Sequence, residues 1–130
     1  MTILTPFLRK VLIADAATSA AAGLLLIGGA DLLSGLLGLP SGLLFWSGVA
    51  LFPFVAALVM VARANAAPAG VIPAIIAINF AWIAGSLFVA FGPIFAPTLI
   101  GKVFVCAQAA AVFLLAELQV MGLRRISAAA

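Results

Sequence analysis

The sequence contains no histidine and no tyrosine, one cysteine, and only three acidic residues among 130. Without histidine, the chain lacks the commonest metal ligand and the usual acid–base group near neutral pH. The single cysteine, Cys106, excludes a disulfide within the chain. The sequence also has no phosphate-binding loop, no glycine-rich dinucleotide motif and no serine–histidine–aspartate set. We therefore expect no enzyme, no metal and no cofactor.

Charged residues make up 7% of the chain and hydrophobic residues 68%, with a mean hydropathy of +1.45. Soluble domains are about half apolar and a quarter charged, so this composition predicts an integral membrane protein. The apolar runs are continuous and about twenty residues long, as in membrane-spanning helices. They do not alternate with polar residues as barrel strands do. The six basic residues are too few to form a nucleic-acid surface, so the expected surroundings are membrane lipids.

The apolar runs divide residues 1–130 into four predicted spans within a single domain. Connectors rich in Gly and Pro separate them, and Asp31 with the leucines after it favours a short interfacial helix over about residues 31–38. Asp15 interrupts the first run where a cleaved signal peptide would be most apolar, so we expect this span to be retained. The predicted fold is all-α, a four-helix membrane bundle with spans at about residues 5–28, 43–64, 71–91 and 98–123.

The basic residues predict the orientation of the bundle. An up-down-up-down chain places five of the six on one side of the membrane and leaves only Lys102 on the other. Since Lys and Arg are concentrated in cytoplasmic segments, we expect both termini in the cytoplasm and the protein in the inner (plasma) membrane. The five residues are Arg9, Lys10, Arg63, Arg124 and Arg125.

Polar residues at a similar depth in three spans are the most informative feature of the sequence. With a rise of 1.5 Å per residue, Asp15 lies about 8 Å past Lys10, Asn79 about 12 Å into its span, and Glu117 about 10 Å before Arg124. Thr18 and Ser19 follow Asp15 at helical-neighbour spacing and extend this layer. We expect these side chains to face the interior of the bundle.

Two interpretations of the polar layer are open. In the structural one, its groups join the helices through hydrogen bonds, each worth about 0.6 kcal/mol. In the functional one, they bind a polar or cationic head group from the cytoplasmic side, or a carboxylate takes up a proton, because charged groups inside a membrane commonly mark such sites. Trp82 shares a helix face with Asn79 and either packs in the core or stacks on a ligand.

Small residues at a spacing of four allow helices to pack closely. Ala16 and Ala20 have this spacing in the first span, where Gly23 continues the small face, and the fourth span has a similar face. We expect these two spans to pack together in the bundle, or else to form a subunit interface. Gln108 lies mid-membrane, with Gln119 eleven residues on along the same face, so Gln108 is expected inside the bundle or, alternatively, at an oligomer contact.

The sequence contains the segments "LRKVLIADA", "GLLGLPSGLL", "INFAW", "PTLIGKVFV" and "AELQVMGLRR". Together these segments resemble a set of small bacterial inner-membrane proteins with four helices and no assigned activity. In size and layout the chain also resembles the DoxX-like four-helix proteins. Small multidrug exporters share the length, the four spans and an acid in the first helix, but they use glutamate where this chain has Asp15, and their aromatic pattern is absent.

These features favour an accessory or scaffold protein that binds lipid or a membrane partner without catalysis. The alternative is a small oligomeric transporter or channel in which Asp15 or Glu117 binds a cation or proton. A third hypothesis is a lipid or quinone bound between the spans. The expected partners are membrane lipids, with further copies of the chain or a larger membrane complex as candidates.

Overall fold

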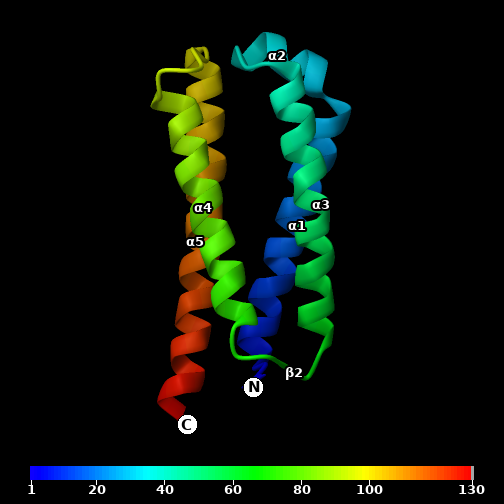
Figure 1. The fold of residues 1–130 in the computed structure, drawn as a ribbon, viewed down its shortest axis with the longest axis vertical. Coiled ribbons are helices and arrows are strands. Elements are labelled where there is room, and N and C mark those ends of the chain that lie inside the picture. Colours follow the sequence, from blue (N-terminus) through cyan, green and yellow to red (C-terminus); the bar gives the residue numbers. More distant parts are fainter. Residues whose placement is uncertain (130) are drawn as a thin grey trace.

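A computed structural model describes the backbone of residues 1–129 and the side chains of residues 1–126. The described chain is almost entirely helical, with two very short strands (Figure 1). Four of its helices are long and apolar enough to cross a membrane, so the chain is a multi-pass membrane protein. The elements are β1 (Thr2–Ile3), α1 (Pro6–Gly28), α2 (Ala30–Leu37), α3 (Ser41–Arg63), β2 (Ala66–Ala67), α4 (Val71–Phe91) and α5 (Leu99–Ala129).

Local sequence signals account for several of the helix ends. The Thr5 hydroxyl accepts a hydrogen bond from the Leu8 amide at 3.2 Å, and Pro6 occupies the first position of α1; both are typical of a helix start. The short helix α2 ends at Gly38, which has a φ of 70°. Glycine adopts this left-handed conformation without steric cost, so the chain can turn there into α3.

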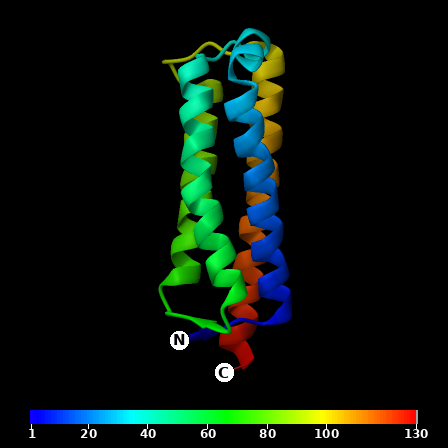
Figure 2. The ribbon, with the colours of Figure 1, turned by 90° about the vertical axis from the view of Figure 1, so that its right-hand side faces the viewer.

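The long helices form two antiparallel pairs, α1 with α3 and α4 with α5, and α1 also packs against α5. Figures 1 and 2 show the two pairs side by side, with the order α1, α3, α4, α5 around the bundle. The fourth side, between α3 and α4, has little contact. The N-terminus and the last turns of α5 lie at one end of the bundle, which we call the terminal end, and α2 lies across the other end (Figure 1).

Two facing glycines bring α1 and α3 into close contact. A Cβ atom on Gly48 would lie 2.9 Å from the Gly23 carbonyl oxygen and 3.0 Å from Leu26 Cβ. At Gly23 the small face of α1 therefore packs on α3. Ala16 is also buried, and Ala20 is half-buried. The expectation that the first and fourth spans pack together is confirmed, since α1 also contacts α5, but the close contact of Gly23 with Gly48 on α3 was not predicted.

The N-terminal segment closes the terminal end. Strand β1 pairs antiparallel with β2, which lies in the connection between α3 and α4. The Leu4 amide donates to the Asn65 carbonyl at 3.1 Å, and Arg9 Nη2 donates to the Ala64 carbonyl at 3.0 Å. These bonds satisfy backbone groups beyond the last turn of α3 and connect the start of α1 to the α3–α4 connection.

The opposite end is closed by a contact between the end of α2 and the start of α5. The Thr98 amide donates to the Leu37 carbonyl at 3.0 Å, and its hydroxyl donates to the Leu36 carbonyl at 2.8 Å. The same hydroxyl accepts from the Gly101 amide at 3.0 Å and so caps the first turn of α5. Two segments far apart in sequence thus join the helix pairs at this end.

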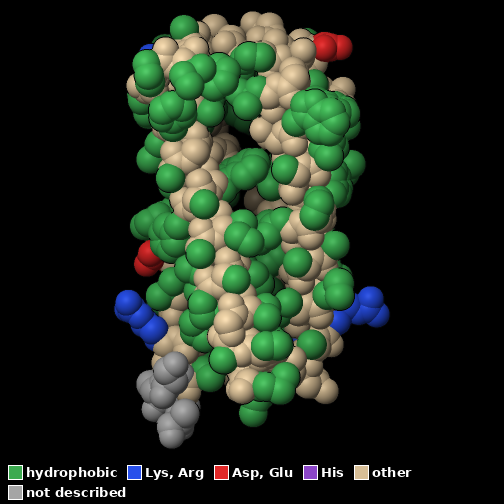
Figure 3. Space-filling model, in the orientation of Figure 1, with side chains coloured by type: hydrophobic (Ala, Val, Ile, Leu, Met, Phe, Trp, Pro, Cys, Tyr) green, Lys and Arg blue, Asp and Glu red, His purple; other side chains and the backbone are tan. Residues whose placement is uncertain are grey.

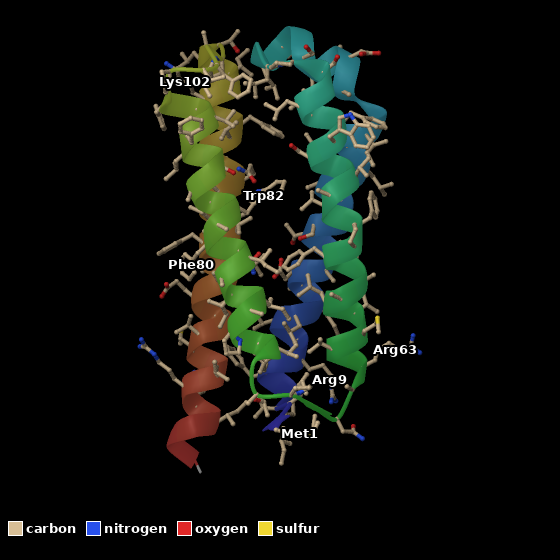
Figure 4. All side chains as sticks on the ribbon, in the orientation of Figure 1. Met1, Arg9, Arg63, Phe80, Trp82 and Lys102 are labelled. Atoms are coloured by element: carbon tan, nitrogen blue, oxygen red, sulfur yellow. The ribbon has the colours of Figure 1, made fainter. Side chains whose placement is uncertain are left out.

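The outer surface of the bundle is largely apolar. Large hydrophobic side chains such as Leu24, Met60 and Leu114 are exposed, and hydrophobic side chains spread over most of the face shown in Figure 3. Lysine and arginine side chains lie toward the lower part of this face, and Figure 4 labels Arg9 and Arg63 near the terminal end and Lys102 at the other. An apolar surface between two polar ends is what a lipid bilayer requires of a spanning protein.

Gly48→Ala is expected to lower the free energy of unfolding by about 1–3 kcal/mol, because the added methyl group overpacks the α1–α3 contact. Gly42→Ala, in the same helix, adds a methyl group with nothing within 4 Å and is expected to be neutral or slightly stabilising. Thermal unfolding of both variants in detergent checks this. Equal melting temperatures would contradict the close contact.

Candidate functional site

A buried polar cluster joins three helices in the half of the bundle nearer the terminal end. Asp15 on α1 is 1% exposed, and Asn79 on α4 and Gln119 on α5 are buried beside it. Asp15 Oδ2 accepts hydrogen bonds from Asn79 Nδ2 at 2.9 Å and from Gln119 Nε2 at 2.7 Å. Asp15 Oδ1 accepts a longer bond, 3.3 Å, from the Ser19 hydroxyl one turn along α1. We call these four residues the Asp15 cluster.

The two carboxamides of the cluster are also bonded to each other. Asn79 Nδ2 donates to Gln119 Oε1 at 3.0 Å as well as to Asp15. The three side chains therefore close a triangle in which each one contacts the other two. A carboxylate accepts through both oxygens, and a primary amide has two N–H donors and an acceptor, so this set suits a shared network. All of the bonding partners of Asp15 are neutral groups.

The structure brings together some of the residues predicted from sequence and separates others. Asp15, Ser19 and Asn79 meet as a group, but Thr18 and Glu117 are exposed on the outside of the bundle. Placing these two in the inward layer was wrong. Glu117 precedes Gln119 by two positions, which is about 200° around a helix, so only one of them can face inward. Thr18 lies beside the buried stripe of α1, and Ser19, one position on, lies within it.

Gln119 is the member of the cluster that the sequence analysis missed. Its depth in α5 is close to that of Glu117, and the sequence analysis assigned the charged residue to the inward layer instead. The available signal was its position eleven residues after Gln108, since both glutamines lie on one face of α5. The structure places that face inward, where Gln119 is fully buried and Gln108 is half-buried.

A second polar group lies nearer to α2, on the same inward faces of α4 and α5. Trp82 Nε1 donates to Gln108 Oε1 at 2.8 Å, and Gln108 Nε2 donates to the Ser86 hydroxyl at 2.9 Å. Gln108 Nε2 also lies 2.9 Å from the Val105 carbonyl of its own helix. The Gln108 carboxamide therefore bonds α5 to α4 within the bundle.

A cavity of about 510 Å³ lies between the two helix pairs in the half of the bundle nearer to α2. Figure 3 shows this face hollowed between the pairs in its upper part, and Figure 4 labels Trp82 beside the same space. All four long helices contribute to its wall, which is mainly aliphatic and aromatic. The lining residues are Ala22, Leu26, Leu39, Leu43, Leu44, Ser47, Ile78, Ala81, Trp82, Gly85, Ser86, Val89, Phe104, Val105 and Gln108.

Comparison of the chain with protein-family models, with curated proteins and with solved structures gives no match. The chemistry of the site must therefore be judged from its own groups. Within the described part of the chain, no three His, Cys, Asp or Glu side chains lie close enough together to hold a metal ion. The described structure contains the hydrogen-bonded Asp15 carboxyl group toward the terminal end and an apolar cavity toward α2.

Asp15→Asn is expected to destabilise the protein by about 1 kcal/mol or more, because neutral hydrogen bonds from Asn79 and Gln119 to an amide oxygen replace the stronger bonds to a carboxylate. Glu117→Gln makes the same change of carboxylate to carboxamide at an exposed position and is expected to have little effect. Unfolding of both variants in detergent micelles is the measurement. An equally stable Asp15→Asn protein would show that the cluster does not support the fold.

Proposed function

We propose that this protein binds a hydrophobic molecule in the cavity between its helix pairs and performs no chemistry on it. The cavity carries the proposal. Its volume of about 510 Å³ lies within the range of about 300–1,000 Å³ typical of small-molecule sites. Such sites are mostly apolar with a few placed polar groups, and this wall has the same character. The role is that of a small accessory membrane protein.

The position of the cavity also supports the proposal. It lies at the level of the spanning helices, between Leu26 on α1 and Val105 on α5, so its surroundings are the hydrocarbon core of a bilayer. A cavity this large is costly to leave empty, because the atoms lining it lose their packing partners. A hydrophobic molecule from the bilayer would restore those contacts at little cost in desolvation.

We further propose that the terminal end faces the cytoplasm. The end that carries the termini has five of the six basic residues, and short segments rich in Lys and Arg remain on the cytoplasmic side of membranes. The resemblance to small bacterial proteins makes the bacterial inner membrane the proposed location. In this orientation the cavity lies toward the outer leaflet.

The protein released from mild detergent is expected to retain a hydrophobic molecule, seen by native mass spectrometry as a discrete added mass. Gly85→Leu should remove that mass, because residue 85 lines the cavity and a Cβ there meets nothing within 4 Å. Ala84→Leu adds a larger side chain at the neighbouring exposed position, outside the lining, and should keep it. A wild-type protein without any retained molecule, or equal retention in both variants, would count against the proposal.

Proton or cation transport through Asp15 is a second candidate function, favoured by one observation. The Asp15 carboxyl group is buried within a spanning helix, and its bonding partners are all neutral. Uncompensated intramembrane carboxylates often serve proton relays and ion pathways. Glu117 is exposed on the outside of the bundle, so it could take part only at an interface with another subunit.

When a membrane potential is imposed, vesicles that contain the wild-type protein are expected to take up protons no faster than empty vesicles. The reason is that the Asp15 carboxyl group already accepts hydrogen bonds from Ser19, Asn79 and Gln119. A pH-sensitive dye inside the vesicles reports the rate. If the wild-type protein conducts protons and Asp15→Asn does not, the second candidate replaces the first. Glu117→Gln is the control, since it removes a carboxylate outside the bundle interior.

A further inference from the structure

Most polar groups of the cavity wall are hydrogen-bonded to one another. The Trp82 indole N–H donates to Gln108 Oε1, and Gln108 Nε2 donates to the Ser86 hydroxyl and to the Val105 carbonyl. The Ser86 hydroxyl in turn donates to the Trp82 carbonyl at 2.7 Å. A ligand with a polar ring or a charged head would find no free N–H donor in this group.

One other polar side chain lines the cavity, the Ser47 hydroxyl on α3. A serine hydroxyl in a helix can bond to a carbonyl of the preceding turn, and it carries no charge. The wall therefore has no feature that would compensate the desolvation of a phosphate, an ammonium group or a carboxylate. An uncharged hydrocarbon segment is the ligand chemistry that fits best.

The shape of the bundle limits how such a segment can enter. Above the cavity, Thr98 is hydrogen-bonded to Leu36 and Leu37, which ties α5 to α2. Below it, the Asp15 cluster joins α1, α4 and α5. The side between α3 and α4 has little contact, so the open route leads sideways into the bilayer.

On the α4 rim of this opening, the exposed lining residue Ile78 is large, but the two that follow it are small. Ala81 and Gly85 both line the cavity and are exposed, and they are one helical turn apart. On the α3 rim, Leu43 and Ser47 have the same spacing. The absence of large side chains at Ala81 and Gly85 leaves a gap through which a flexible chain can pass between the helices.

We propose that the cavity takes up one acyl chain of a phospholipid from the leaflet nearer to α2, while the headgroup stays at the membrane surface. This inference rests on the proposed function and specifies its ligand. A phospholipid fits because its chain is apolar throughout, its headgroup needs no partner in the wall, and the opening faces the bilayer. A quinone would have to place its carbonyl groups among donors that are already engaged.

Trp82 provides a direct test, because it lines the cavity and Trp46 is the only other tryptophan. In a Trp46→Phe background, vesicles of phosphatidylcholine with brominated acyl chains should quench Trp82 fluorescence, since bromine acts at short range. Gly85→Leu should remove most of this quenching, and Ala84→Leu should leave it unchanged. Ala81→Leu is a second filling variant, and retained melting temperatures confirm that each variant is folded.

The possible outcomes separate this inference from the proposed function. Equal quenching in the filled variants and in Ala84→Leu would mean that only lipid on the outer surface is sensed, which overturns the inference. In unbrominated vesicles, saturable quenching by an added benzoquinone that Gly85→Leu abolishes would also overturn it, while the proposal of a hydrophobic ligand would stand. If neither compound gives quenching that depends on the cavity, and no mass is retained, both fail.

Discussion

The structure depends on one oxygen atom, Asp15 Oδ2, which accepts amide hydrogen bonds from two other helices at 2.9 and 2.7 Å. In a bilayer no bulk water competes for these groups, and an isolated carboxylate at the membrane centre costs about 2.5 kcal/mol or more. Asn79 and Gln119 must therefore remain beside Asp15. Because they lie on α4 and α5, this requirement fixes the second helix pair against the first in rotation and height.

The cavity lies between the two places along the bundle where hydrogen bonds join the helix pairs. The Asp15 cluster draws the pairs together in the half nearer the terminal end, and the contact between Thr98 and Leu37 joins them again at the α2 end. Between these two points, the interior is lined by apolar side chains and by a polar group, centred on Gln108, that bonds α5 to α4 but not to the other pair. The two pairs can therefore stand apart there, with α3 and α4 bordering an opening to lipid.

The sequence was sufficient to predict the long helices, the short helix across one end, and the common depth of Asp15 and Asn79. Length and apolarity determine a span, and a fixed rise per residue determines depth. Rotation about the helix axis is different, because helices that are apolar on every side carry no clear inward stripe. That is why Glu117 was chosen over Gln119, and why the close contact of Gly23 with Gly48 on α3 was not predicted. The cavity arises from the relative placement of whole helix pairs, which no local pattern encodes.

The role of the Asp15 cluster in joining the helix pairs is tested most directly by a double-mutant cycle between Asp15→Ala and Gln119→Ala, measured as free energies of unfolding in a bilayer or bicelle. The two changes are expected not to be additive, with a coupling of about 0.5 kcal/mol or more, because each removes the same buried hydrogen bond. Additive effects would contradict this role, since Asp15 and Gln119 would then contribute independently and the cluster would not be what joins the two helix pairs.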